Sequence, residues 1–279
     1  MSISRACSLI DLARSMWYYT TQKDDSELID KLNELAEQLP TRGLDEYVGR
    51  LKAQGYPWNR KRIYRVYKLL RLEKRRKRKR RLPSRNPEPL SVPTKPNYCW
   101  SMDFMSDALD NGRRIRVLNI IDDFNREALW VDAQYSYPSE FVVRALEDLE
   151  VERGLPTKIR VDNGPEFISK NLAQFCQLKG VHLEFIKPGT PTQNAFVERF
   201  NRHYREDVLD AYLFGSLSQV NIINEKWKMD YNDNHPHRSL GYKSPRVFKE
   251  LYRKNIIDSE SVKAKMNDSL QSSALTESP

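Results

Sequence analysis

This sequence contains few cysteines, and it has neither a long apolar run nor a nucleotide-binding loop. Its 279 residues include three cysteines, Cys7, Cys99 and Cys176, which are odd in number and far apart and so do not predict a disulfide framework. No run approaches the roughly 20 apolar residues of a membrane-spanning helix. The first residues lack the basic and apolar segments of a secretory signal, which favours an intracellular protein. No Gly-x-x-x-x-Gly-Lys-Ser/Thr loop occurs, so no nucleotide cofactor is expected.

What the sequence does have is positive charge, and that charge is unevenly distributed. The chain contains 47 Lys and Arg against 38 Asp and Glu, a formal net charge of +9. Residues 1–100 carry 23 cationic and 11 acidic side chains, whereas residues 101–279 carry 24 and 27. The basic part predicts binding to a polyanion, and the mildly acidic remainder can carry carboxylate chemistry.

Residues 1–72 show the apolar spacing of helices. Leu28, Leu32, Leu35 and Leu39 follow one helical face. Helices are expected over residues 5–19, 25–39, 45–54 and 58–72, with a turn at residues 55–57. The last helix is basic, and its candidate DNA contacts are Arg60, Arg62, Arg65 and Lys68. We interpret residues 1–72 as a small all-α, helix-turn-helix-like DNA-binding region, with a helical bundle bearing solvated cations as the alternative.

A basic, proline-rich linker is expected over residues 73–97. Its eight consecutive cations are Lys74, Arg75, Arg76, Lys77, Arg78, Lys79, Arg80 and Arg81. Such a run neutralises phosphates without reading bases, and the prolines that follow it cannot continue a helix. Phosphate contact is favoured here over a nuclear-localisation signal or a solvated tether.

From residue 98 the pattern changes to short strands alternating with helices. Strands are expected over residues 98–105, 115–122, 127–132, 158–161 and 182–186, and helices over residues 138–154, 170–179 and from 193 onward. Asn111-Gly112 predicts a hairpin turn between the first two strands. This order predicts an α/β domain over residues 98–250, a mixed five-stranded sheet flanked by helices. Residues 251–279 are expected to be a polar tail.

Three acids in this domain can converge on one site. Asp103 and Asp162 are each expected at the end of a strand, and a right-handed crossover permits those two strands to pair. Glu198 lies on the last long helix, with 35 residues between it and Asp162. Carboxylates from three elements suit Mg²⁺ or Mn²⁺, and a pair of such ions serves in-line phosphoryl displacement. A single strand-end Asp is more often a turn residue, so the surrounding sequence decides between these roles.

The surrounding motifs resemble those of a known family. They are Trp100-Ser101-Met102-Asp103-Phe104, Ile121-Asp122-Asp123-Phe124-Asn125-Arg126-Glu127, Asp162-Asn163-Gly164-Pro165-Glu166-Phe167, Thr190-Pro191-Thr192-Gln193-Asn194-Ala195-Phe196-Val197-Glu198-Arg199-Phe200-Asn201 and Asn234-His235-Pro236-His237-Arg238-Ser239-Leu240-Gly241-Tyr242-Lys243-Ser244-Pro245. Over about residues 98–250 the chain resembles the DDE transposases and integrases of the retroviral-integrase superfamily. The resemblance is closest to the second-reading-frame transposase proteins of bacterial insertion sequences, and the 35-residue interval is typical of them.

The resemblance implies a ribonuclease-H-like core in which Asp103, Asp162 and Glu198 are the catalytic residues and hold Mg²⁺ or Mn²⁺, two ions in all. It implies a reaction in two stages: a water-derived nucleophile cuts the end of the element, and the freed 3′-hydroxyl attacks another phosphodiester. The implied partners are double-stranded DNA, further copies of the chain on that DNA, and an upstream-frame helix-turn-helix product, fused or separate. The implied location is the cytoplasm of a bacterium, at the nucleoid.

Two other functions compete with this one. A non-catalytic DNA-binding regulator of transposition would not require three acids at these positions. A ribonuclease H proper would require neither the basic arm nor the 35-residue interval. The transposase interpretation is therefore favoured over both.

Other polar residues of this domain receive secondary interpretations. Further candidate DNA contacts near the third acid are Lys187, Asn194, Arg199 and Arg202. His235 and His237 do not predict zinc, because two more ligands at suitable spacing are missing. Asp122 and Asp123 form another acidic pair, whose position at the end of the second strand favours a structural role.

Overall fold

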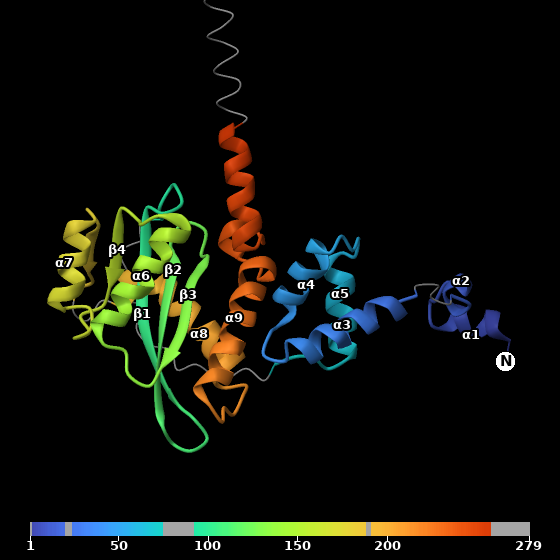
Figure 1. Cartoon of the computed structure of the whole chain (residues 1–279). Helices are drawn as coiled ribbons and strands as arrows, with labels where there is room; N and C mark the ends of the chain where they lie inside the picture. Colours follow the sequence, from blue (N-terminus) through green and yellow to red (C-terminus); the bar gives the residue numbers. More distant parts are fainter. Residues whose placement is uncertain (1, 20–23, 75–91, 188–190, 258–279) are drawn as a thin grey trace, which may run out of the picture. The chain divides into compact units, whose positions relative to one another are not determined.

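The computed structural model describes residues 2–19, 24–74, 92–187 and 191–257 of the chain (Figure 1). Contacts between residues divide the chain into two compact units. The first unit consists of Met1–Pro40 and Trp58–Lys74, and the second of Thr41–Pro57 and Arg75–Pro279. The second unit thus takes a segment, residues 41–57, that the sequence assigned to the N-terminal helical region.

Helices alone make up the described part of the first unit. They are α1 (Ile3–Leu9), α2 (Arg14–Trp17), α3 (Ser26–Gln38) and α5 (Arg60–Leu69). The leucine stripe of α3 is buried, and so are Ile63 and Val66 of α5, because the two helices pack together. The single helix expected over residues 5–19 is wrong. It breaks after Leu9, where Asp11 has a φ of 52°, a left-handed conformation that Asp tolerates better than most residues.

Helix α4 (Leu44–Ala53) belongs to the second unit, where ionic contacts hold it. Arg50 donates two hydrogen bonds, of 2.9 and 2.6 Å, to the carboxylate of Asp230. Gly49 lies against Pro236, whose Cβ would be 2.5 Å from any Cβ at position 49. Only glycine permits this approach, so α4 and the segment around Pro236 fit each other closely.

A five-stranded mixed sheet forms the centre of the second unit. Its strands are β1 (Cys99–Ala108), β2 (Arg114–Asp122), β3 (Ala128–Gln134), β4 (Lys158–Val161) and β5 (His182–Phe185). They lie in the order β3-β2-β1-β4-β5, and β1 pairs antiparallel with β2 but parallel with β4. The hairpin predicted between β1 and β2 is present, with Gly112 at a φ of 78°. The sequence-based prediction of a mixed five-stranded sheet flanked by helices is confirmed.

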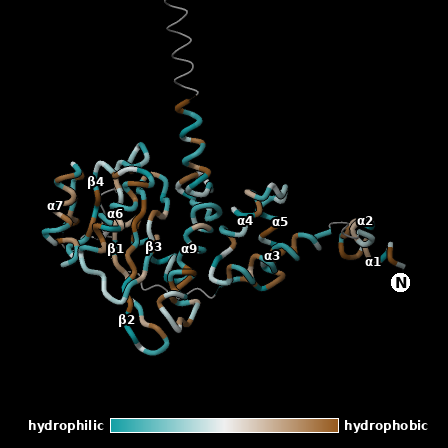
Figure 2. The backbone as a smooth tube through the Cα atoms, in the orientation of Figure 1, coloured by the Kyte–Doolittle hydropathy of each residue, from teal (hydrophilic) through white to brown (hydrophobic). Residues whose placement is uncertain are grey.

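Helices cover both faces of the sheet (Figure 1). Helices α6 (Ser139–Arg153) and α7 (Lys170–Leu178) bury one face, together with Trp100 and Met102 of β1. The other face packs against α8 (Ala195–Tyr204), the π-helical turn η2 (Arg205–Leu209) and α9 (Leu217–Asn234). The strands form the apolar centre of the unit (Figure 2). Short 3-10 turns, η1 (Pro191–Asn194) and η3 (Arg238–Leu240), and a helix over residues 245–257 complete it.

Side chains of α9 supply partners to the backbone of the outer strand β3. Asn221 accepts a hydrogen bond from the Ala133 N–H (2.8 Å) and donates one to the Ala133 carbonyl (3.0 Å). Asn232 makes the same pair of bonds with Ala128, at 2.8 and 2.9 Å. An amide side chain carries a donor and an acceptor side by side, as a peptide group does. Two asparagines of α9 therefore occupy the backbone groups that a further strand would use.

Candidate functional site

Two of the three predicted acids meet in the second unit. The parallel register pairs Ser101 of β1 with Arg160 of β4, so that position 103 lies level with position 162, directly after the end of β4. The sequence placed Asp103 at the end of a strand, and this expectation is wrong. Strand β1 continues to Ala108 because β2 pairs with it over its whole length, beyond the point where β4 stops. The site thus lies at the carboxyl end of β4, beside the middle of β1.

The charge environment of Asp103 is shaped by the other two acids. Burial and the neighbouring Asp162 carboxylate raise the pKa of Asp103 to about 7, and Glu198 adds a smaller contribution in the same direction. The N–H of Phe104 and the side chain of Asn201 oppose this shift by donating hydrogen bonds to Asp103. Like charges held this close are costly, and a bound cation would relieve the cost.

Asp162 begins a tight turn that also holds a fourth acid. Its Oδ1 accepts a hydrogen bond from the N–H of Gly164 at 2.9 Å. A Cβ at position 164 would lie 3.0 Å from that oxygen and 3.3 Å from Oε2 of Glu166. Glu166 is ion-paired with Arg116 of β2, and the Arg116 guanidinium lies 4.4 Å from the centre of the Phe104 ring. The absence of a side chain at Gly164 therefore leaves room for the carboxylates of Asp162 and Glu166 close to the turn. Arg116 neutralises the charge of Glu166.

Glu198 reaches the site from α8 but is exposed. Partial burial raises its pKa and the nearby Arg202 opposes that shift. Within the described ranges, no three His, Cys, Asp or Glu side chains gather closely enough to hold a metal ion. The donor set itself, two close carboxylates with a third in electrostatic reach, is of the hard-oxygen kind that suits Mg²⁺ or Mn²⁺.

Two asparagines at this site were missed in the sequence. Asn201 of α8 donates a hydrogen bond from Nδ2 to Oδ2 of Asp103 at 2.7 Å. Its Oδ1 accepts a hydrogen bond of 2.7 Å from Nδ2 of Asn119, which lies directly opposite Asp103 on β2. Both asparagines are buried, Asn119 completely. The available signal was a polar residue inside each of two apolar patterns, one on a central strand and one on the inner face of a helix.

The predicted DNA contacts of the second unit lie in different environments. Arg199 and Arg202 are exposed on α8, and Lys187 is exposed just after β5. Asn194 differs from them, because it is buried and its Nδ2 donates to the carbonyl of Met102 at 3.5 Å. A phosphate contact from Asn194 requires that bond to break.

Several predicted DNA contacts of the first unit already have ionic partners. Arg62 and Arg65 of α5 both pair with Asp25 at the start of α3, and Lys68 lies 3.7 Å from Glu73. Arg60 and Lys74 are exposed. The cations Arg75, Arg76, Lys77, Arg78, Lys79, Arg80 and Arg81 lie outside the described residues.

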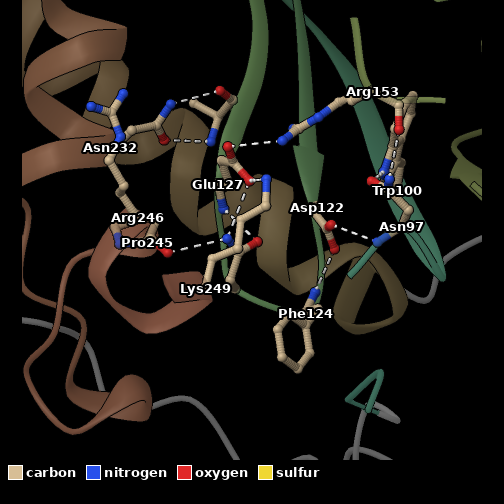
Figure 3. Close-up of polar contacts among 12 residues, drawn as sticks. Asn97, Trp100, Asp122, Phe124, Glu127, Arg153, Asn232, Pro245, Arg246 and Lys249 are labelled. Carbon is tan, nitrogen blue, oxygen red and sulfur yellow. Dashed lines mark hydrogen bonds and ion pairs between the residues drawn. The ribbon is translucent and has the colours of Figure 1, made fainter. Parts of the chain in front are cut away.

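The acidic pair at the end of β2 makes structural contacts, as its position in the sequence indicated. Asp122 accepts hydrogen bonds of 2.9 Å from the N–H groups of Asn97 and Phe124 (Figure 3). Asp123 is fully buried, where it accepts a hydrogen bond from Ser101 (2.7 Å) and pairs with Arg160 (2.9 Å). Asp122 thus fixes the turn, and Asp123 ties it to β1 and β4.

Glu127, at the end of this turn, ties the C-terminal helix to the sheet. It pairs with Arg153 of α6 and with Lys249 of the helix over residues 245–257, each at 2.9 Å (Figure 3). Asn125 donates to the carbonyl of Pro245 at 3.2 Å. The expected polar tail over residues 251–279 therefore begins within a helix that the turn anchors, since that helix runs to residue 257.

Three of the four histidines of the second unit, His203, His235 and His237, pack together edge to face. The ring centres of His203 and His235 are 4.8 Å apart, and those of His235 and His237 are 4.7 Å apart. Burial lowers the pKa of all three, so they are neutral at physiological pH. Nδ1 of His235 lies 2.8 Å from Glu46 of α4, so these histidines help to hold α4 in the second unit.

Comparison with known proteins places this geometry in a family. Two family models described as integrase core domain match residues 93–191 and 179–245. A protein of insertion element IS407 from Burkholderia multivorans is 38% identical over 255 residues, which cover 91% of this chain and 92% of the relative. The chain belongs to the insertion-sequence transposases of the DDE/integrase superfamily. Transposase InsD of insertion element IS2 from Escherichia coli is 28% identical over 243 residues, covering 81% and 79% of the two chains.

The fold of this insertion-sequence transposase is ribonuclease-H-like, as its strand order and family require. Among solved structures, the magnesium-bound catalytic core of HTLV-2 integrase matches 56% of this chain and 98% of its own length, at 19% identity and a TM-score of 0.46. In the described ranges, no helix of the transposase combines the length and apolar character needed to cross a bilayer.

Proposed function

We propose that this chain cuts and joins DNA at the ends of an insertion sequence by metal-dependent phosphoryl transfer. The observation that carries the proposal is the meeting of Asp103 and Asp162 at the end of β4, in a chain of the transposase family. Glu198 is the third proposed catalytic residue, because α8 extends past this pair and brings its charge into reach of Asp103.

Asp103, Asp162 and Glu198 would hold Mg²⁺ or Mn²⁺, two ions in all. Such ions, when bound, lower the pKa of an attacking water and stabilise the departing oxygen. The protein's own part is to keep the first two carboxylates adjacent on a rigid sheet and to carry the third on a helix. Water would be the nucleophile in the first stage and a DNA 3′-hydroxyl in the second.

DNA is the proposed partner, held by cations on both units. Arg199 and Arg202 lie on the same helix as Glu198 and so suit phosphates near the cut. The basic residues of 60–81 would contribute further phosphate contacts. Joining two DNA ends requires at least two active sites, which supports an oligomer on DNA, with or without an upstream-frame helix-turn-helix product. A nucleoid location in a bacterium follows from the substrate.

The test is strand cleavage and joining of a labelled duplex that carries the element's terminal repeat. Wild type and Asp162→Asn are compared with Mg²⁺, with Mn²⁺ and with chelator. Metal-dependent joining by wild type alone is expected. Equal activity in both proteins would overturn the proposed triad. Binding by both without cleavage, even with the upstream product added, would favour a DNA-binding regulator instead.

A further inference from the structure

Two buried amide side chains, joined by hydrogen bonds, connect three elements at the site. Asn119 of β2 donates to Asn201 of α8, and Asn201 donates to Asp103 of β1, both at 2.7 Å. The bonded groups lie in the layer between the sheet and α8, among apolar neighbours such as Val117 and Val197. Hydrogen bonds in such surroundings are strengthened by the low local dielectric.

The carboxylate of Asp103 sets the direction of both hydrogen bonds in this series. While Asp103 is ionised it can only accept, so Asn201 must direct its NH₂ group toward it. Oδ1 of Asn201 then faces Asn119, which must in turn present its own NH₂ group. This arrangement leaves Oδ1 of Asn119 without a partner among the described residues, although a buried acceptor of this kind normally has one. The orientation of Asn119 is thus kept at a cost to folding.

The position of Asn201 links two proposed metal ligands. It follows Glu198 by three residues on α8, so the two side chains lie about one helical turn apart. A bond from Asn201 to Asp103 therefore fixes both the height and the rotation of α8 against β1. It also occupies one position on Oδ2 of Asp103, while the N–H of Phe104 occupies one on Oδ1. The remaining lone pairs are left for a cation.

We propose that Asn119 and Asn201 form a positioning relay that orients the carboxylate of Asp103 and sets the reach of Glu198 toward it. The inference rests on the proposed function, since it concerns the same acids. Neither asparagine is a catalytic residue. The relay acts by holding one ligand in orientation and the helix of another in place, as groups bonded to metal ligands do in established metal sites.

A matched control is available on the same face of the sheet. Asn224 of α9 is also fully buried in a polar pair, where it accepts a hydrogen bond of 2.6 Å from the hydroxyl of Tyr204. Its own Nδ2 donates to Asn221 at 3.1 Å. Replacing Asn224 removes a buried amide without touching the bonds of Asp103, so it reports the structural cost alone.

The experiment compares the full chain with Asn201→Ala, Asn119→Leu and Asn224→Ala. Mn²⁺ affinity is measured by electron paramagnetic resonance, unfolding by a thermal melt, and cleavage as a function of Mn²⁺ concentration. Asn201→Ala should weaken Mn²⁺ binding about 10–100-fold and raise the Mn²⁺ needed for cleavage by a similar factor. Asn119→Leu should have the same effect at about 3–10-fold. Asn224→Ala should lower the melting temperature and leave Mn²⁺ affinity unchanged.

Each failure has its own signature. Wild-type Mn²⁺ affinity in folded Asn201→Ala would overturn the relay while leaving the proposed function intact. An equal loss of affinity in Asn224→Ala would also overturn it, because the effect would then follow from loosened packing. A wild-type protein that neither binds Mn²⁺ nor cleaves would overturn the proposed function and the relay together.

Discussion

The two faces of the sheet are built from alternate residues of the same strands and each buries an apolar cluster, but they differ at the position of Asp103. Trp100 and Met102 of β1 point to the α6/α7 face, where they belong to a cluster of buried apolar side chains. Asp103, one residue further along β1, points to the α8/α9 face and meets the amides of Asn119 and Asn201. Apolar packing on both faces holds the sheet together, and the α8/α9 face gives up some of that stability to accommodate a carboxylate and two amides.

The largest expected effect is on catalysis, from Asp103→Asn. The substitution keeps the size of the side chain and removes its charge, so the protein should fold and lose DNA cleavage by roughly three orders of magnitude. Single-turnover cleavage of the terminal-repeat duplex measures the loss. Retention of more than a tenth of wild-type activity would remove Asp103 from the proposed catalytic residues.

The adjacent position on the other face should respond in the opposite way. Met102 is fully buried in the α6/α7 cluster, so Met102→Ala should lower the free energy of unfolding by about 2–5 kcal/mol. Cleavage per folded molecule should stay close to wild type at a temperature where the variant is still folded. Urea denaturation followed by circular dichroism gives the first value. A fall in activity without a fall in stability would contradict the division between the two faces.

The charge at Asp103 should make stability depend on pH. Burial beside Asp162 raises the pKa of Asp103 to about 7, above its ordinary value of 3.8, so the folded state binds this proton more tightly than the unfolded state does. The contribution of Asp103 to stability is therefore present below about pH 4 and is lost as the pH rises to about 7. In chelator at pH 8, Asp103→Asn should exceed wild type in unfolding free energy by about 1–3 kcal/mol.

Chemical denaturation at pH 5 and pH 8 checks that prediction. The advantage of Asp103→Asn should be smaller at pH 5, where wild-type Asp103 is largely protonated. Added Mn²⁺ should stabilise wild type and not the variant. An advantage that is the same at both pH values would show that charge at position 103 is not its source.

The smallest effect is expected at the outer strand. Asn232→Ala removes the partners of the Ala128 N–H and carbonyl. Water can replace part of that pairing at the edge, so the free energy of unfolding should fall by about 1 kcal/mol. Cleavage should be unaffected. Amide hydrogen exchange at Ala128 should speed up in the variant, and unchanged exchange there would show that Asn232 does not protect β3.

The sequence predicted the elements of the sheet well, because strand periodicity is a local signal, and it pointed to Asp103 and Asp162, which lie close together in the structure. It did not predict that β1 runs past Asp103, because this depends on pairing with β2 along its whole length. Nor could it show that α4 packs on the second unit, which depends on contacts as distant as Arg50 with Asp230. Asn201 was missed for the same reason. Its role exists only once α8 lies on β1.

The asparagines of α9 have a consequence for copies of the chain held at high local concentration, as they would be on DNA in the proposed function. Strands with bare edges fuse into shared sheets when the local concentration of copies is high, and such fusion is hard to reverse. Asn221 and Asn232 deny neighbouring copies that route at β3, because its backbone groups are already engaged at Ala133 and Ala128. At this edge, then, crowded copies meet through side chains and can separate again, as repeated assembly on DNA in the proposed function would require.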